Sequence, residues 1–406
     1  MDTDIRDGSM SDNKPVKPDT LLTHAGSHPE LNHGAVNPPI YRVSTVVFPS
    51  VAEMKEGEKH PFDHMRYGRQ GTPTSFAFEE AVTALDGGTG ALATCSGQAA
   101  ITTALGGLLR AGDHALIADS VYNPTRRYCS EYLAQSGVEI EFYDPLIGGG
   151  IDALIKPNTK IVYTESPGSL TFEIQDLPAI SAAAHAKGAL VVIDNTWATG
   201  LFFDAFAHGA DISVQAATKF LSGHSDAMLG VISCKSKEVW TRLKNYMSYS
   251  GMSAGSEEVY LALRGMRTLA VRLRQHQASG LTVARWLRER PEVARVIYPA
   301  LPGSPGHEIW KRDFKGACGL FAVELKPCPQ PAVNAMVDSL AYFGLGFSWG
   351  GFESLILPTS GNINRTATQW RPDGPTLRLH IGLEDPDDLI ADLARGFDHL
   401  GAAMGV

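Results

Sequence analysis

Between residues 62 and 255 the chain alternates short apolar runs with segments of helical periodicity. The apolar runs are rich in Val, Ile and Leu and contain few polar residues, which is typical of strands buried on both faces of a parallel sheet. This alternation predicts an α/β fold in which helices cover both faces of a mostly parallel sheet. The candidate strands are 91–94, 115–118, 139–142, 160–163 and 190–193, and the candidate helices are 98–109, 126–136 and 180–186.

The segment before this region predicts an irregular N-terminal arm. Residues 1–61 mix short apolar pieces with Gly and Pro, and the first 20 residues are mostly polar. We therefore expect about the first 20 residues to be disordered and 43–48 to form a short strand. An arm of this kind has little apolar surface of its own to bury, so it is expected to lie over a partner subunit.

The segment after this region predicts a second domain. Apolar residues recur at helical spacing over 257–290 and predict one long amphipathic helix. We place a large domain at 62–256 and a smaller C-terminal α/β domain at 257–406. The elements expected in the smaller domain are strands near 320–323 and 377–380 and a final helix from Pro386 to Leu400, with Asp385 as its N-cap.

Composition argues against several classes of protein. The 406 residues carry a net charge of −9, which disfavours a general nucleic-acid binder because neutralising phosphates requires clustered Lys and Arg. No apolar run reaches the roughly 18 residues of a membrane span, and the polar N-terminus predicts no signal peptide. The five cysteines are scattered and form no C-x-x-C pair, so we expect neither disulfides nor a bound metal, and a reducing, cytoplasmic location.

A lysine and an aspartate follow two apolar runs. Lys219 stands in the segment 211–226, and Asp194 ends the run that begins at Leu190. A lysine just after a strand can form a Schiff base with an aldehyde cofactor, and a carboxylate at a strand end can keep a pyridine nitrogen protonated. Each residue alone also fits a structural role, as a solvated lysine or a helix cap. Together they are the two groups that pyridoxal phosphate requires from a protein.

Two motifs are suited to a phosphate group. The turn 94–100, which contains Gly97 and Gln98, joins a strand to a helix and leaves backbone N–H groups free to bind an anion. Tyr67 and Arg69 stand on a glycine-rich loop, where the arginine offers a bidentate fork. The structural alternatives are a tight turn without a ligand and a solvated loop.

Two further motifs are suited to an aromatic ring and a carboxylate. Tyr122 follows a predicted strand, where it can stack on a cofactor ring and exchange a proton. Arg378 emerges from a later strand near the glycine-rich loop 347–354, where it can bind a carboxylate. A core tyrosine and an ion pair at the domain junction are the structural alternatives.

These motifs together resemble the Cys/Met-metabolism family of pyridoxal-phosphate-dependent enzymes, which have the aspartate aminotransferase-like (type I) fold. The resemblance runs over nearly the whole chain, from Leu21 to Leu400. It is carried by Tyr67-Gly-Arg69, Asp144-Pro-Leu-Ile-Gly148, Glu165-Ser-Pro-Gly168, Asp194-Asn-Thr-Trp-Ala198, Gln215-Ala-Ala-Thr-Lys-Phe-Leu221, Gly223-His-Ser-Asp226, Phe347-Ser-Trp-Gly-Gly351 and Leu379-His-Ile-Gly-Leu-Glu-Asp385.

The resemblance implies a role for each cofactor-binding residue. Lys219 is expected to be the Schiff-base lysine, Asp194 the partner of the pyridine nitrogen, and Tyr122 the residue that stacks on the ring. All three are therefore expected to be catalytic. The phosphate is expected to be bound by the backbone N–H groups of Gly97 and Gln98, by the Thr218 hydroxyl, and by Tyr67 and Arg69 of a neighbouring subunit.

The resemblance also implies how a substrate binds and how subunits assemble. Ser348 and Arg378, with Trp349 beside them, are expected to hold the α-carboxylate of an amino-acid thioether. Because the site is shared between subunits, the protein is expected to be at least a dimer, and the family usually forms a dimer of dimers.

Within the family, three positions favour the branch that cleaves the β C–S bond of L-cystathionine, a step of methionine biosynthesis. Pro124, Ala216 and Trp349 match the pattern of that branch. Gln70 and Arg127 depart from it near the expected distal end of the substrate. The alternatives that stay open are a γ-acting relative, such as a methionine γ-lyase or a cystathionine γ-synthase, a broader cysteine-S-conjugate β-lyase, and a binding protein without catalysis.

Overall fold

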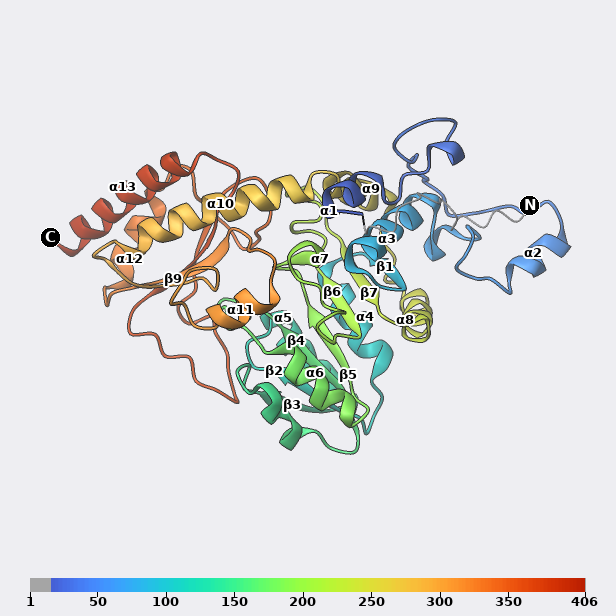
Figure 1. Ribbon diagram of the computed structural model, residues 1–406, viewed down its shortest axis with the longest axis horizontal. Coiled ribbons are helices and arrows are strands. Elements are labelled where there is room, and N and C mark those ends of the chain that lie inside the picture. The colour runs from blue at the N-terminus through green and yellow to red at the C-terminus, as the bar shows by residue number, and fades with distance from the viewer. Residues whose placement is uncertain (1–15, 406) are drawn as a thin grey trace.

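The computed structural model describes residues 16–405 and contains two β-sheets (Figure 1). The larger sheet has the strand order β1-β7-β6-β5-β4-β2-β3. All neighbours from β6 to β3 are parallel, whereas β7 is antiparallel to both β1 and β6. The predicted mostly parallel sheet is therefore confirmed. Its strands are β1 (Gly90–Thr94), β2 (His114–Ala118), β3 (Glu139–Tyr143), β4 (Thr159–Glu165), β5 (Leu190–Asp194), β6 (Ile212–Gln215) and β7 (Gly230–Cys234).

Helices pack against this sheet, which explains why its strands are continuously apolar. Every residue of β2 and of β7 is buried. The helix α4 packs on β6 and β7, α6 packs on β5, and α3 packs on β1. The helices of this part are α3 (Pro73–Asp86), α4 (Gly97–Leu108), α5 (Asn123–Arg127) with the π-helical turn Tyr128–Leu133, α6 (Leu177–Ala186), α7 (Thr199–Phe202), α8 (Lys237–Ser250) and α9 (Ser256–Met266), and 3-10 turns lie at Gly68–Gln70 and Gly148–Leu154.

The smaller sheet forms the C-terminal part of the molecule. Its strand order is β10-β11-β12-β9-β8, and all its pairs are antiparallel except β10–β11. Figure 1 shows the long helix α10 running along one side of the molecule toward α13 at the C-terminal end. The elements are α10 (Leu269–Arg288), β8 (Val293–Ile297), α11 (His307–Asp313), β9 (Leu320–Leu325), α12 (Gln330–Asp338), β10 (Gly344–Leu345), β11 (Leu355–Pro358), β12 (Thr376–His380) and α13 (Pro386–Met404).

The N-terminal arm differs from its prediction. The helices α1 (Pro18–His24) and α2 (Val51–Gly57) and a 3-10 turn at Pro29–Leu31 form there. The expected disorder of residues 1–15 lies outside the described residues, and 18–20 belong to α1. The predicted strand 43–48 is wrong, because Thr45 makes only an isolated bridge to Tyr67 and no strand pairs with the segment.

The predicted helix 257–290 is interrupted, which corrects a second prediction. The helix α9 ends at Met266 and α10 begins at Leu269. The Gly265 carbonyl accepts the Thr268 N–H at 3.1 Å and the Arg272 Nη2 at 2.8 Å, so the regular helical pattern stops there. Two other predictions hold: α13 starts at Pro386, and the Asp385 side chain caps it.

Among residues 16–405, none of the helices combines the length and apolar character needed to cross a membrane. The predicted domain boundaries near 62 and 257 stay predictions.

Candidate active site

Lys219 follows β6 and faces the loop that leads into β11. Its Nζ donates a hydrogen bond to the Ser348 Oγ at 2.7 Å and lies 5.1 Å from the ring centroid of Trp349. Burial, together with the positive charge of Arg378, lowers the pKa of Lys219 to about 8. A neutral amine is therefore accessible near neutral pH, as a nucleophile or general base requires.

Asp194 ends β5 and lies close enough to Lys219 for the two charges to interact. Burial raises the pKa of Asp194, and the hydrogen bonds from Thr196 and the charge of Lys219 oppose this shift. Asp194 Oδ1 accepts from the Thr196 N–H at 3.0 Å and from its hydroxyl at 2.5 Å. The same hydroxyl oxygen accepts the Ala216 N–H at 2.9 Å, so Thr196 joins the carboxylate to the loop that carries the lysine.

The turn between β1 and α4 is shaped to receive an anion. Ser96 caps α4 by accepting the Ala99 N–H at 3.0 Å. The N–H groups of Gly97 and Gln98, in the first turn, have no partner within a helix. A Cβ added at Gly97 would lie 2.6 Å from the Ala216 Cβ, so this turn packs closely on the Lys219 loop only with glycine.

The Thr218 hydroxyl has hydrogen-bond partners within the chain, and its predicted contact with a phosphate stays a prediction. The hydroxyl donates to the Leu229 carbonyl at 3.1 Å and accepts the Leu229 N–H at 2.9 Å. A contact with a phosphate would therefore require the hydroxyl to give up its donation to Leu229.

Tyr122 lies at the start of α5, with about half of its side chain exposed. Burial and the carboxyl groups of Glu165 and Asp194 raise the pKa of Tyr122, and Arg378 opposes this shift. The phenol is thus within electrostatic reach of both Asp194 and Arg378. Its backbone N–H donates to the Glu165 Oε2 at 2.7 Å.

Arg378 lies on β12 and is buried. Its Nη2 donates to the carbonyl oxygens of Gly346, Phe347 and Ser348 at 2.8–3.1 Å. Its buried Nε has no hydrogen-bond partner in the described part of the chain. The arginine thus fixes the loop that presents Ser348 and still has a donor for a carboxylate.

Tyr67 and Arg69 are not part of this group. An Arg69 nitrogen, Nη1, bonds the Ser248 carbonyl and lies 3.1 Å from the Ser248 hydroxyl. The guanidinium lies 5.8 Å from the Tyr67 ring centroid, and the Tyr67 side chain is nearly half exposed. Within residues 16–405 no hydrogen bond joins either residue to Lys219 or Asp194.

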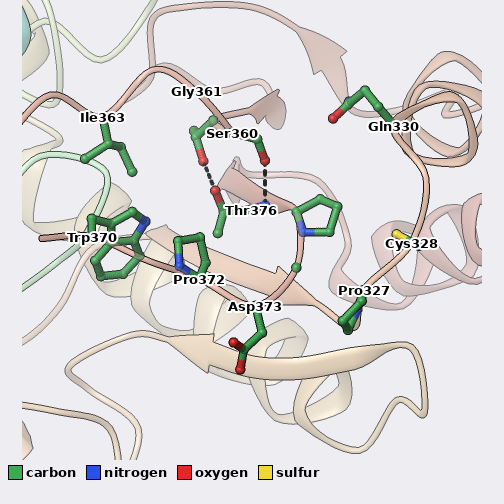
Figure 2. A pocket seen from close by; sticks show the side chains of 13 residues that line it. Pro327, Cys328, Gln330, Ser360, Gly361, Ile363, Trp370, Pro372, Asp373 and Thr376 are labelled. Atoms are coloured by element: carbon green, nitrogen blue, oxygen red, sulfur yellow. Dashed lines mark hydrogen bonds between the residues drawn. The ribbon is translucent and has the colours of Figure 1, made fainter.

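A cavity in the C-terminal part of the chain lies away from this group. It measures about 540 Å³ and contains none of the predicted site residues (Figure 2). It is bordered by the start of α12 and by the segment 359–376, with Trp370 on one side.

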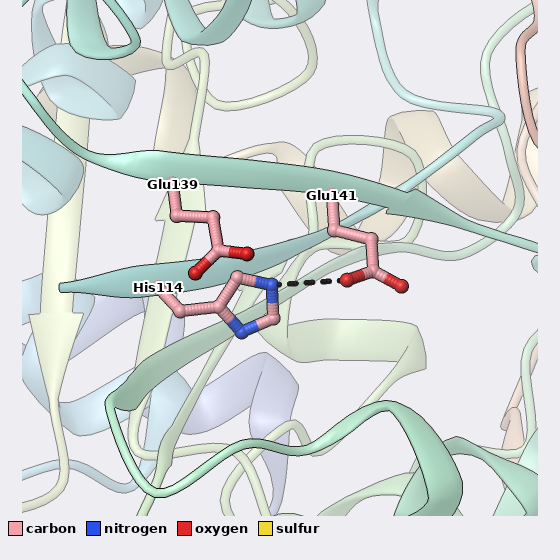
Figure 3. A group of neighbouring side chains, drawn as sticks. All are labelled: His114, Glu139 and Glu141. Atoms are coloured by element: carbon pink, nitrogen blue, oxygen red, sulfur yellow. Dashed lines mark ion pairs between the residues drawn. The ribbon is translucent and has the colours of Figure 1, made fainter.

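A cluster with the side chains of a metal site also lies elsewhere. His114, Glu139 and Glu141 come together on β2 and β3, with 3.3 Å between the His114 Nε2 and a Glu141 oxygen (Figure 3). Lys156 already neutralises this cluster, because its Nζ lies 2.8 Å from Glu139 and 2.6 Å from Glu141. Burial and Lys156 lower the pKa of His114. We assign this cluster a structural role.

Two side chains near the site received no role from the sequence. Glu165 ends β4 and is the register partner of Asp194, and Thr196 holds the Asp194 carboxyl. The position of Asp194 directly after an apolar run identified it as a candidate, whereas Thr164 separates Glu165 from the comparable run before it.

The arrangement fits pyridoxal phosphate. A lysine of lowered pKa, a strand-end carboxylate and a glycine turn at a helix N-terminus lie around one edge of a mostly parallel sheet, the edge at which such folds bind ligands. These features define the class of pyridoxal-phosphate-dependent α/β enzymes.

Comparison with known proteins gives the family. Residues 19–398 match the model of the Cys/Met metabolism PLP-dependent enzymes, and the chain belongs to that family. It is 45% identical to the cystathionine beta-lyase of Escherichia coli, over 94% of this chain and 98% of that one. It is 43% identical to the cystathionine beta-lyase of Salmonella typhimurium, over 93% and 98%.

A solved structure agrees in fold. Cystathionine gamma synthase from Xanthomonas oryzae, in complex with aminoacrylate and cysteine, superposes with a TM-score of 0.88 at 31% identity, covering 96% of this chain and 100% of that one. The aspartate aminotransferase-like fold and the cofactor pyridoxal phosphate, both expected from the sequence, are thereby confirmed.

Proposed function

We propose that this protein is a carbon–sulfur lyase that cleaves the β C–S bond of L-cystathionine with water to give homocysteine, pyruvate and ammonia. The observation that carries the proposal is the contact between Lys219 and Ser348 beside Arg378, which puts a base of lowered pKa next to a carboxylate-binding group. The β-lyase relatives are 43–45% identical to this chain, whereas the γ-synthase structure is 31% identical.

The residues of the chain divide the reaction between the two ends of the substrate. Arg378 and Ser348 hold the α-carboxylate and orient the Cα–H bond toward Lys219. Pyridoxal phosphate, when bound, supplies an electron sink for the charge that develops at Cα. Lys219 removes the Cα proton, and Lys219 or Tyr122 delivers a proton to the sulfur as the Cβ–S bond breaks.

The other assigned residues hold the cofactor. Asp194 would accept the N–H of the cofactor ring, where charge develops, and Tyr122 would stack on that ring. The backbone N–H groups of Gly97 and Gln98 would bind the cofactor phosphate. The Trp349 ring, with its centroid 5.5 Å from that of Phe220 and 5.1 Å from the Lys219 Nζ, would form a wall of the site beside the lysine.

Product analysis with L-cystathionine tests the proposal. The expected products are pyruvate and homocysteine, and Lys219→Ala should form neither at a measurable rate. Cysteine with 2-oxobutyrate would move the protein to the γ-acting branch. Activity on a simpler β-thioether alone would mean that Gln70 and Arg127 have changed the distal pocket.

We also propose that the working protein is a homodimer or a dimer of dimers located in the cytoplasm. Tyr67 and Arg69 would reach the phosphate of the neighbouring subunit, which accounts for their separation from Lys219 in one chain. The five cysteines are all free, as in a reducing compartment. Sedimentation of the loaded protein tests the assembly, and a monomer at working concentration would contradict it.

A further inference from the structure

Glu165 is a carboxyl group that the proposed chemistry does not use. It is the last residue of β4 and pairs in parallel register with Asp194, the last residue of β5. Register partners on parallel strands point to the same face of a sheet, so the two carboxyl groups lie side by side at the edge that carries the site. A pair of neighbouring carboxyl groups is costly, because their charges repel in a buried setting.

The repulsion between the two carboxyl groups is relieved because they differ in protonation. Burial and the charge of Asp194 raise the pKa of Glu165 well above its usual range. Asp194 has two hydrogen bonds from Thr196 and the positive Lys219 nearby, all of which favour its charged form. Glu165 is therefore the member that keeps its proton, and it does not compete with Asp194 for a positively charged ring nitrogen.

Glu165 also fixes the backbone of Tyr122. Its Oε2 accepts the Tyr122 N–H at 2.7 Å, across 43 residues of sequence. The Tyr122 hydroxyl makes no hydrogen bond within residues 16–405, and α5 is only five residues long. The Glu165 side chain thus fixes the backbone position from which the Tyr122 ring projects.

We propose that Glu165 is a positioning residue, which holds Tyr122 where its ring would stack on the cofactor ring that Asp194 would bind. This proposal rests on the roles assigned above to Tyr122 and Asp194. It does not depend on the identity of the substrate.

The test measures cofactor binding without substrate. The cofactor is removed from the protein, pyridoxal phosphate is titrated back, and the Kd and the visible circular dichroism of the bound cofactor are recorded. Glu165→Ala removes the acceptor and should weaken binding about tenfold and reduce the dichroism. Glu165→Gln keeps an acceptor oxygen and should stay within about twofold of the wild type. Glu139→Ala, a carboxyl group at the start of β3, is the matched control and should change neither quantity.

A double-mutant cycle shows whether Glu165 acts through Tyr122. In a Tyr122→Ala background, where no ring remains to be positioned, Glu165→Ala should cause no further loss of affinity. Losses that multiply independently would overturn the proposal, as would wild-type dichroism in Glu165→Ala. A Glu165→Gln variant as weak as Glu165→Ala would also overturn it, because the acceptor would then not be the cause. Inactivity toward cystathionine leaves every one of these readouts intact, so failure of the proposed function is distinguished from failure of this inference.

Discussion

Lys219 is an amine whose neutral form is favoured by the folded chain. Its pKa falls from the ordinary 10.5 to about 8, so folding without cofactor costs free energy wherever the unfolded chain holds the proton more tightly. This free-energy cost of folding has its largest value below pH 8, decreases as the pH rises, and disappears above pH 10.5. We expect Lys219→Met to stabilise the cofactor-free protein at pH 7 by about 1–3 kcal/mol.

Calorimetry of the cofactor-free protein at pH 7 and pH 10 checks this expectation. The gain in Tm should shrink as the pH rises, and Lys160→Met, at an exposed lysine of β4, should show no such trend. A gain of equal size at both pH values would contradict the assigned cause.

Asp86 is expected to make the stability of the folded chain depend on pH with the opposite sign. It is buried and accepts hydrogen bonds from Ser233 at 2.6 Å and from Gln215, and burial raises its pKa to about 6. The folded chain therefore binds this proton more tightly than the unfolded chain, and its contribution to stability is lost as the pH rises from about 4 to about 6. In Asp86→Asn this loss should be absent, so the Tm of the variant relative to the wild type should increase between pH 5 and pH 7.5. A constant difference across that range would refute the assignment.

At the scale of elements, the segment between β11 and β12 is anchored to the large-sheet part of the chain by the buried carboxylate of Asp119 and by the ion pair of Arg365 with Glu173. Asp119, directly after β2, accepts from the N–H groups of Thr366, Ala367 and Thr368 at 2.8–3.2 Å and pairs with Arg126. Removing one partner of a buried ion pair typically costs about 3–5 kcal/mol. Asp119→Ala should therefore lower the Tm by several degrees and speed proteolytic cleavage within 360–371. Thr366→Ala, which keeps the backbone donor, should do neither.

The sequence predicts those elements whose burial produces a regular pattern of apolar residues along the chain. Strands such as β2 and β5 were predicted because burial on both faces leaves an uninterrupted apolar run. The break between α9 and α10 was missed because it depends on the Gly265 carbonyl bonding to Arg272, which periodicity does not contain. Lys219 and Asp194 were identified from their places after apolar runs. Glu165 was missed as a site residue because its partner, Tyr122, is distant in sequence and bonds through its backbone.

At the scale of the whole molecule, the expected site is divided between subunits. If Arg69 serves the neighbouring subunit, then Arg69→Ala and Lys219→Ala damage different sites of the same dimer. Co-expressed in equal amounts, the two inactive variants should form mixed dimers with one intact site, and about a quarter of the wild-type activity should return. Mixed dimers purified with two different tags provide the measurement. An absence of recovered activity in those dimers would place Arg69 in the site of its own chain.

The Arg127 side chain is exposed and pairs with Glu131, one helical turn further on. Solvent screens an exposed pair of this kind, so it contributes little to stability and can be replaced during evolution at little expense to folding. Lys219, Asp194 and Arg378, by contrast, lie in closely packed strand ends and loops where few substitutions are tolerated. During evolution, substitutions at positions such as Arg127 can therefore change the preference among thioethers, while the residues that break the C–S bond stay the same.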